Sequence, residues 1–367
     1  MSIEIIGLVA TKDASEIKGS REEGGAVDAD YLVRIARAHE AAGFDRVLIG
    51  YGATGVDGWA VGAKTLNATE RLKVLIAHRP GFVQPTLLAR KAATLDNLSG
   101  GGRVGVHFIT GGSEIDQHRD GDFVGHDDRY KRTAEYMGIV RRVLNSSEPF
   151  DYTGAFYRYE GAYSMVKPAT EAGIPLYFGG ASAPALLAGA ENADVYMLWG
   201  EPLAGVEERI GQIRGVAATF GRTPSFSLST RPIIAATEDE AWARAERIGD
   251  ALSTRLENSA WGQNRGGNTS VGGARLRAYA AEGEVLDERL WTKVAALTGG
   301  SYNATALVGT AEQVAEALLR YYDLGIRHFL IRGFDPYEDA VDYGEQLVPL
   351  LRSGASARAE SASLVAG

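Results

Sequence analysis

The chain contains no cysteine among its 367 residues. Disulfide bonds, thiolate metal sites and a cysteine nucleophile are therefore excluded, and this composition fits a reducing compartment. Long apolar runs are missing too, because no stretch approaches the roughly eighteen residues that a bilayer-spanning helix needs. The first residues contain a short apolar run, but no basic region precedes it and no small-residue cleavage site follows it. We therefore expect a cytoplasmic protein that does not associate with a membrane.

Basic residues are fewer than acidic ones, and the formal net charge is −9. An acidic balance argues against nucleic acid or an anionic membrane surface as a partner. Hydrophobic residues make up 45% of the chain and are spread evenly, so a large core can be buried. A chain of this length is long for one ordinary domain, but it suits a (β/α)8 barrel with insertions.

Short apolar runs alternate with longer stretches of helical period, which is typical of a parallel sheet with crossover helices. A G-x-G-x-x-G fingerprint is missing after the first run, which argues against an open nucleotide-binding sheet. Eight strand–helix units are what a closed barrel requires, and the sequence therefore predicts a (β/α)8 barrel. The predicted strands are residues 3–10, 46–51, 72–78, 103–110, 174–180, 195–200, 226–236 and 328–333.

Capping residues place several of the helices. Asp28 is the expected N-cap of the first helix. Thr310 and Gln313 have the spacing of a capping box, and Gly325 is expected to end that helix. Pro336 is expected at the first position of the last helix.

Two insertions and a tail interrupt this repeat. We expect an irregular excursion at 145–173 and a mobile, polar, Gly-rich lid at about 250–305. Residues 352–367 are low in complexity and are predicted to be disordered. We expect residues 1–351 to form a single barrel domain that includes these insertions.

Small and polar residues gather where two of the predicted strands end. Thr110 and Gly111 close the strand at 103–110, and a flat polar ring could approach the backbone there. Residues 179–182, with the sequence Gly-Gly-Ala-Ser, end another strand and lead into a helix. Backbone N–H groups at a helix N-terminus together with a serine hydroxyl suit a phosphate. Barrels of this type place their chemistry at such strand ends.

Several strings resemble one family in the order that the family has them. The chain resembles the bacterial luciferase-like flavin monooxygenases, and within them the FMNH2-dependent alkanesulfonate monooxygenases. The strings are AAGFDRVLIG, ERLKVLIAHRPGFVQPTLLARKAATLDNLSGGGRVGVHFITGG, HDDRY, PLYFGGAS, DVYMLWGEP, TALVGT and LGIRHFLIRGF. They extend over nearly the whole chain.

The resemblance implies a two-component enzyme. It would use O2 and FMN in its reduced form, FMNH2, delivered by a separate NAD(P)H-dependent flavin reductase, and it would act on a small substrate as a homodimer or homotetramer. The cofactor residues implied are Thr110, Gly111, Tyr130, Gly179, Gly180, Ala181 and Ser182. The catalytic candidates are His107, Trp199 and three cations that suit an anionic substrate, Lys12, Arg231 and Arg332.

Five features of the sulfonate-cleaving relatives, one of them a pair of residues, are replaced in this chain. Relatives carry histidine, cysteine, an Arg-x-His pair, arginine and tyrosine, where this chain has Lys12, Gly55, Ser229 with Arg231, Thr298 and Phe334. Three other functions therefore stay open: a flavin monooxygenase for a sulfone or a non-sulfur compound, a deazaflavin-dependent oxidoreductase, and a non-catalytic flavin-binding protein. The expected lid argues against the last, because turnover needs a lid and storage does not.

The remaining histidines have simpler interpretations. His78, which precedes the Arg-Pro-Gly motif, is expected to be structural. His126 is followed by Asp127 and Asp128, but no other clustered ligands accompany these three residues. We therefore predict no metal site.

Overall fold

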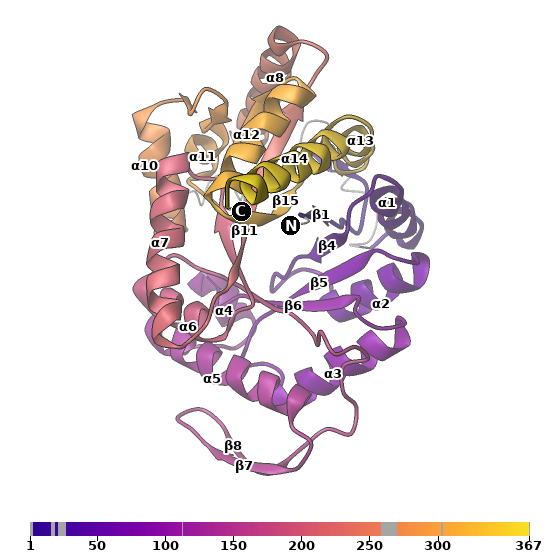
Figure 1. Cartoon of the computed structure of the whole chain (residues 1–367), viewed down its shortest axis with the longest axis vertical. Coiled ribbons are helices and arrows are strands. Elements are labelled where there is room, and N and C mark those ends of the chain that lie inside the picture. The colour runs from indigo at the N-terminus through magenta and orange to yellow at the C-terminus, as the bar shows by residue number, and fades with distance from the viewer. Residues whose placement is uncertain are drawn as a thin grey trace. The chain divides into compact units, whose positions relative to one another are not determined.

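The computed structural model describes residues 3–15, 19–20, 27–111, 113–257, 270–301 and 304–366. Gly112 and residues 258–269 and 302–303 of the expected lid lie outside these ranges. Eight parallel strands with helices between them make a (β/α)8 barrel in the described ranges, as the sequence predicted. Along the chain the strands and helices alternate (Figure 1). No described helix has the length and apolarity that crossing a membrane requires.

The chain divides into two compact units, and each is described by itself. The first unit is Met1–Val47, Leu198–Gly211 and Ser225–Gly367, and the second is Leu48–Met197 and Gln212–Pro224. Three elements contain residues of both units: strand β4 (Arg46–Ile49), strand β10 (Val195–Trp199) and helix α7 (Leu203–Thr219).

The first unit contains both ends of the chain. Its elements are β1 (Glu4–Leu8), β2 (Ala14–Ser15), β3 (Gly19–Ser20), α1 (Ala29–Ala41), β11 (Ser225–Ile234), α8 (Glu238–Glu257), α10 (Val271–Glu282), β12 (Val285–Leu286), β13 (Leu290–Trp291), α11 (Lys293–Thr298), β14 (Ala306–Gly309), α12 (Ala311–Leu324), β15 (Ile326–Ile331), α13 (Pro336–Asp342), the π-helix η2 (Tyr343–Leu347) and α14 (Val348–Ala366).

Strand β15 is central to this unit, because β1 and β11 pair with it in parallel on its two sides. Strand β11 has two partners in succession. Its residues 226–230 pair with β15, and residues 231–234 pair with β14 instead. Arg231 is therefore the first residue after the β15 pairing ends.

The second unit is nearly continuous in sequence. Its elements are α2 (Gly58–Ala68), β5 (Lys73–His78), α3 (Pro85–Leu98), β6 (Val104–Phe108), α4 (Glu114–Arg119), α5 (His126–Asn145), β7 (Phe150–Thr153), β8 (Arg158–Ala162), β9 (Leu176–Gly179) and α6 (Ala183–Asn192). Strand β6 pairs in parallel with β5 and with β9.

The capping predictions are confirmed. The carboxylate of Asp28 accepts hydrogen bonds from two backbone N–H groups of α1. The capping box of Thr310 and Gln313 is present in full, and Gly325 ends α12 in the left-handed conformation. Pro336 occupies the first turn of α13. Local hydrogen bonding therefore determines these helix ends.

The two insertions are more ordered than the sequence indicated. Residues 150–162 form an antiparallel hairpin of β7 and β8, which projects beyond α5 in Figure 1. Residues 271–298 contain α10, β12, β13 and α11, and Trp291 of β13 belongs to the hydrophobic core of the first unit. The expected mobility of a lid stays a prediction.

The tail predicted to be disordered is helical instead. Helix α14 continues through residues 352–366, and Ala355 is buried. Arg358 forms ion pairs with Glu316 and Asp323 of α12. Five of the small residues that suggested low complexity are alanines, and alanine has the highest helix propensity.

Candidate functional site

The predicted site residues fall into two groups, one in each unit. His107, Thr110, Gly111, Tyr130 and residues 179–182 belong to the second unit, whereas Lys12, Trp199, Arg231 and Arg332 belong to the first. Most of them lie at or just beyond the carboxyl end of a barrel strand. Barrel enzymes of this class carry their active sites at those ends.

Tyr130 and Ser182 are brought together by the second unit. Ser182 is the N-cap of α6, and its hydroxyl accepts a hydrogen bond from the Ala185 N–H at 3.4 Å. A side-chain hydrogen bond also joins Ser182 to the Tyr130 hydroxyl, and burial raises the pKa of Tyr130. Two hydroxyls therefore meet at the N-terminus of a ten-residue helix, where the helix dipole favours an anion.

The glycines of this group have packing roles that the sequence did not predict. A Cβ on Gly180 would lie 2.6 Å from the Cβ of Ala185, so the loop can approach α6 only without a side chain. Gly111 has a φ of +88°, and a Cβ there would lie 1.7 Å from Nε2 of Gln117. Gly111 thus accommodates a protein side chain, whereas the sequence had suggested room for a flat ring.

Gln117, on the short helix α4, was not identified from the sequence as a residue of the site. It is fully buried, and its Nε2 donates to the carbonyl of Thr110 at 2.8 Å. The Thr110 hydroxyl lies 3.1 Å from that of Thr133 on α5. Ser113 caps α4 through the Asp116 N–H, and this local pattern is the signal that could have predicted the helix.

Arg79, of the Arg-Pro-Gly motif, holds α4 against the end of β5. Its guanidinium forms ion pairs with Asp116 and Asp120, the second at 3.2 Å. It also lies 4.6 Å from the centre of the Tyr51 ring, whose hydroxyl donates to Asp120 at 2.6 Å. The motif is therefore structural in this chain: it fixes the helix that fixes Thr110 and Gly111.

His107 of β6 is a neutral histidine at the strand end. Burial lowers its pKa to about 4, so the imidazole is uncharged near neutral pH. Its Nδ1 is buried and has no hydrogen-bond partner among the described residues. A Cβ on Gly179 would lie 3.6 Å from its Nε2. An unsatisfied buried polar atom is costly, which makes His107 a candidate for contact with a ligand.

His78 is structural, as predicted. It is buried, and its Nε2 lies 2.9 Å from the hydroxyl of Tyr136, which itself donates to the carbonyl of Val83 at 2.8 Å. Nε2 therefore carries the proton and donates to Tyr136. Burial, with a smaller effect of Lys91, lowers the pKa of His78 to about 3.

The neutral state of His78 predicts a pH effect on stability. As the pH falls from about 6.5 to about 5, the unfolded chain binds a proton at this position and the folded chain does not. We expect the free energy of unfolding to fall over this window, and His78→Gln to lessen the fall by up to about 1.4 kcal/mol per pH unit. Urea denaturation at several pH values measures this. Identical pH dependence in the variant and the parent would contradict the prediction.

Arg231 lies in the interior of the first unit with 2% of its surface exposed. Its Nη2 donates to the carbonyl of Gly333 at 2.8 Å. Its guanidinium carbon lies 3.5 Å from the centre of the Phe334 ring, so one face of the cation is covered by that ring. Phe334 stands where the sulfonate-cleaving relatives have tyrosine, and it supplies an aromatic face for the arginine.

The loop that holds Arg231 is itself held by Asp339. Asp339 is 1% exposed, and one carboxylate oxygen accepts from the N–H groups of Phe334 and Asp335 at 2.7 and 2.9 Å. The other oxygen pairs with Arg244, which also donates to the carbonyl of Ile234 on β11. A Cβ on Gly333 would overlap Asp339, so glycine is required there. No local sequence pattern pointed to Asp339 or Arg244.

The other two cations are more accessible than Arg231. Lys12 follows the end of β1 and is partly exposed. Arg332 follows β15, is partly exposed, and donates its backbone N–H to Thr230 at 3.5 Å, next to Arg231 on the neighbouring strand. Arg231 and Arg332 therefore come together at their strand ends.

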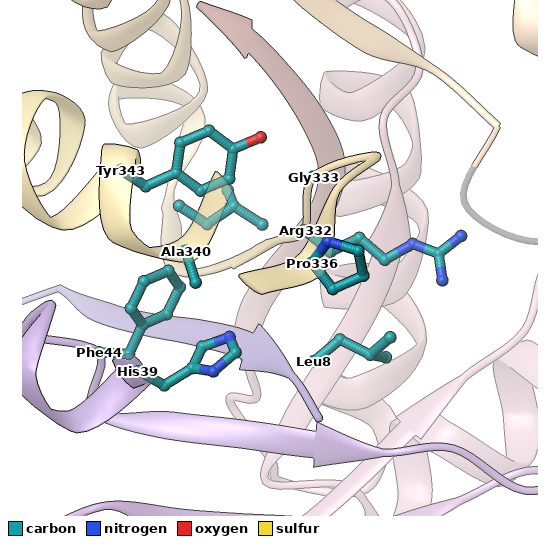
Figure 2. Close-up of a pocket in the computed structure, with 9 residues that line it drawn as sticks. Leu8, His39, Phe44, Arg332, Gly333, Pro336, Ala340 and Tyr343 are labelled. Carbon is teal, nitrogen blue, oxygen red and sulfur yellow. The ribbon is translucent and has the colours of Figure 1, made fainter. Parts of the chain in front are cut away.

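A small cavity of about 30 Å³ lies beside Arg332, lined by Leu8, His39, Phe44 and Tyr343 among others. Figure 2 shows the guanidinium of Arg332 directed away from His39 and Phe44, so only its stem lines the cavity. This volume is that of about one water molecule in the liquid. The cavity is therefore too small for a flavin or an organic substrate.

Trp199 ends β10 and is half-buried, and it packs against the hydrophobic core of the first unit. Thr298, at another departing position, is buried and donates its hydroxyl to the carbonyl of Val294. In the described part of the chain, no three metal-ligating side chains are grouped as an ion would require. His126 instead lies 2.7 Å from the Asp127 carboxylate on the surface.

The family model of the luciferase-like monooxygenases matches residues 8–328. The chain belongs to this family. A solved riboflavin lyase with modified FMN and riboflavin is 20% identical, with 96% of this chain and 92% of that one covered and a TM-score of 0.74. EDTA monooxygenase from Chelativorans sp. BNC1 is 18% identical, with coverages of 96% and 94% and a TM-score of 0.77.

A further structural neighbour is an enzyme that depends on F420. An F420-dependent secondary alcohol dehydrogenase is 18% identical, with coverages of 96% and 100% and a TM-score of 0.68. At these identities the structural likeness concerns the fold. The family assignment therefore establishes a luciferase-like monooxygenase, and it leaves the substrate to be inferred from the residues of this chain.

Proposed function

We propose that this luciferase-like monooxygenase is the oxygenase of a two-component system. A separate NAD(P)H-dependent reductase would supply FMNH2, and O2 would oxygenate a small anionic organosulfur compound. The best candidate is an alkanesulfonate, which would be converted to an aldehyde and sulfite. The observation that carries the proposal is the pair of hydroxyls, Tyr130 and Ser182, at the N-terminus of α6.

The residues present fit FMN. The α6 N-terminus, with Ser182 and Tyr130, would hold the phosphate. The buried Nδ1 of His107, which lacks a partner among the described residues, would hydrogen-bond to the bound ring or to the substrate. When bound, reduced FMN would supply the two electrons with which one oxygen atom of O2 enters the product and the other leaves as water.

The protein's own side chains would bind the flavin and the substrate and orient them. His107 is neutral near pH 7 because its pKa is lowered to about 4, so it would exchange hydrogen bonds without adding charge. Arg231, Arg332 and Lys12 would provide positive charge for a sulfonate. Of the three cations Arg231 is the most buried, and a charge interacts with a bound anion more strongly in a buried site than in water.

The test supplies the protein with FMN, NADH, a flavin reductase and a panel of straight-chain alkanesulfonates, and measures sulfite. Sulfite release that requires O2, reductase and this chain is the expected result. The structural likeness to an F420-dependent dehydrogenase favours one second candidate, a deazaflavin oxidoreductase. Reduced F420 with alcohols or ketones is therefore run in parallel, and turnover there without sulfite release from the panel would replace the first proposal with the second.

The phosphate assignment predicts a specific effect of Ser182→Ala. We expect FMNH2 binding to weaken by about 1–2 kcal/mol, the scale of a hydrogen bond to a charged group. Because Ser182 also caps α6, stability should fall by about 1 kcal/mol as well. Thr310→Ala, which removes the cap of α12, is the control: it should cost similar stability and leave flavin affinity unchanged. Anaerobic flavin titration measures this, and unchanged affinity in Ser182→Ala would remove the assignment.

A further inference from the structure

The loop that follows β10 is buried in the first unit by segments far along the chain. Its Gly200 N–H donates to the carbonyl of Ser229 at 2.8 Å, and the Thr305 hydroxyl donates to the Gly200 carbonyl at 2.7 Å. The Tyr321 hydroxyl donates to the carbonyl of Glu201 at 2.8 Å. The backbone directly after Trp199 is therefore held on both sides.

Helix α10 is joined to this loop by an ion pair. The Nε of Arg275 lies 2.9 and 3.0 Å from the two carboxylate oxygens of Glu201, and its Nη2 lies 2.6 Å from one of them. The side chain of Glu201 is 7% exposed and that of Arg275 is 23% exposed. The hydrogen bond to Glu201 raises the pKa of Arg275. Removing one member of such a pair leaves the other charge buried without compensation.

Glycines allow α10 to lie directly on the loop and on the indole of Trp199. A Cβ on Gly272, in the first turn of α10, would lie 3.0 Å from a carbon of the Trp199 ring. A Cβ on Gly205 would lie 2.4 Å from the hydroxyl of Tyr279, one turn after Arg275 on α10. Helix α10 thus lies close to Trp199 and to the first turn of α7, where bulkier residues would separate them.

We propose that Arg275 is a positioning residue, whose ion pair with Glu201 holds α10 against Trp199 and so fixes the indole at the end of β10. Trp199 is the residue through which it acts. The importance of this for oxygenation rests on the proposed function and on the place at the active site that the family resemblance implies for Trp199. A fixed indole would orient a bound ligand and keep water from it.

The direct test needs neither cofactor nor substrate. The chain has five tryptophans, and labelling with 5-fluorotryptophan gives each a separate 19F resonance, with that of Trp199 assigned by Trp199→Phe. We expect Arg275→Met to shift or broaden the Trp199 resonance, and Arg275→Lys to shift it less. The control is Arg289→Met, which breaks a different ion pair of the first unit, that of Arg289 with the more exposed Glu238 at 2.8 Å. An unshifted Trp199 resonance in both Arg275 variants, each folded by circular dichroism, would overturn the proposal.

The second measurement separates this proposal from the function on which it rests. With an alkanesulfonate, we expect Arg275→Met to lower the sulfite formed per FMNH2 oxidised about tenfold, the lower end of the range for a hydrogen bond between charged groups. Flavin affinity should stay unchanged, and Arg275→Lys should recover part of the yield. One combination of results separates the two ideas. If the Arg275 variants shift the Trp199 resonance but Trp199→Phe leaves the sulfite yield unaltered, Trp199 does not act at the site. The positioning of Trp199 by the Arg275–Glu201 ion pair would still be supported.

Discussion

Asp339→Ala is expected to lower the free energy of unfolding by about 3–5 kcal/mol, the scale for breaking a buried ion pair by removing one partner. The carboxylate is 1% exposed, pairs with Arg244, and accepts from the N–H groups of Phe334 and Asp335. Its loss leaves a cation and two amides without their partner. Urea denaturation, with the midpoint and the slope both recorded, measures the change.

Two further variants show whether the effect comes from these contacts. Asp339→Asn keeps one carbonyl acceptor and should lose less stability than Asp339→Ala. Glu338→Ala removes an exposed carboxylate from the same helix, and it should change stability by less than about 0.5 kcal/mol. A loss below about 1 kcal/mol in Asp339→Ala, similar to an average substitution, would show that the loop does not depend on this carboxylate.

Arg231→Lys is expected to lose oxygenation while it keeps flavin binding. A lysine retains the charge, but it has no planar face for Phe334 and no fork of donors for a sulfonate. We expect product formation in a single turnover with FMNH2 to fall about 10- to 100-fold, the range for losing a hydrogen bond between charged groups. Rapid-quench measurement of sulfite, with flavin affinity measured in parallel, gives both quantities.

Arg327→Lys is a matched control on strand β15. Arg327 also stacks on an aromatic ring, that of Tyr322 at 4.0 Å, and also donates to a carbonyl, that of the same residue at 2.7 Å. Arg327 is the second residue of β15 and therefore lies away from the carboxyl end of the strand. Wild-type turnover in Arg231→Lys, or an equal loss in Arg327→Lys, would show that Arg231 supports the fold and does not bind the substrate.

Most of the fold follows from patterns within short stretches of sequence. The eight strands and the ends of α1, α12 and α13 were predicted because period and capping involve residues only a few positions apart. Helix α14 was missed because composition was weighed above the propensity of alanine. The β7–β8 hairpin was missed because its strands are short and much of its surface is exposed.

The candidate site was predictable only where its contacts are local. Ser182 was singled out because a serine follows two glycines where a strand leads into a helix, and the structure places it as the N-cap of that helix. Arg275 contacts Glu201 across 74 residues, and Arg231 contacts Gly333 across 102. Pairings over such separations leave no periodic signal. The reason for glycine at 111 depends in the same way on the tertiary position of the Gln117 side chain.

The pairing of β1 with β15 matters for the order in which the chain can fold during synthesis. Glu4, Ile5 and Ile6 are in register with His328, Phe329 and Leu330. The first strand therefore stays without this partner until residues 328–330 have been synthesised. The second unit, with Leu48–Met197 in one stretch, can form its own contacts much earlier. The edge of β1 that later pairs with β15 is therefore unpaired during much of synthesis, and an unpaired strand edge can pair with other chains.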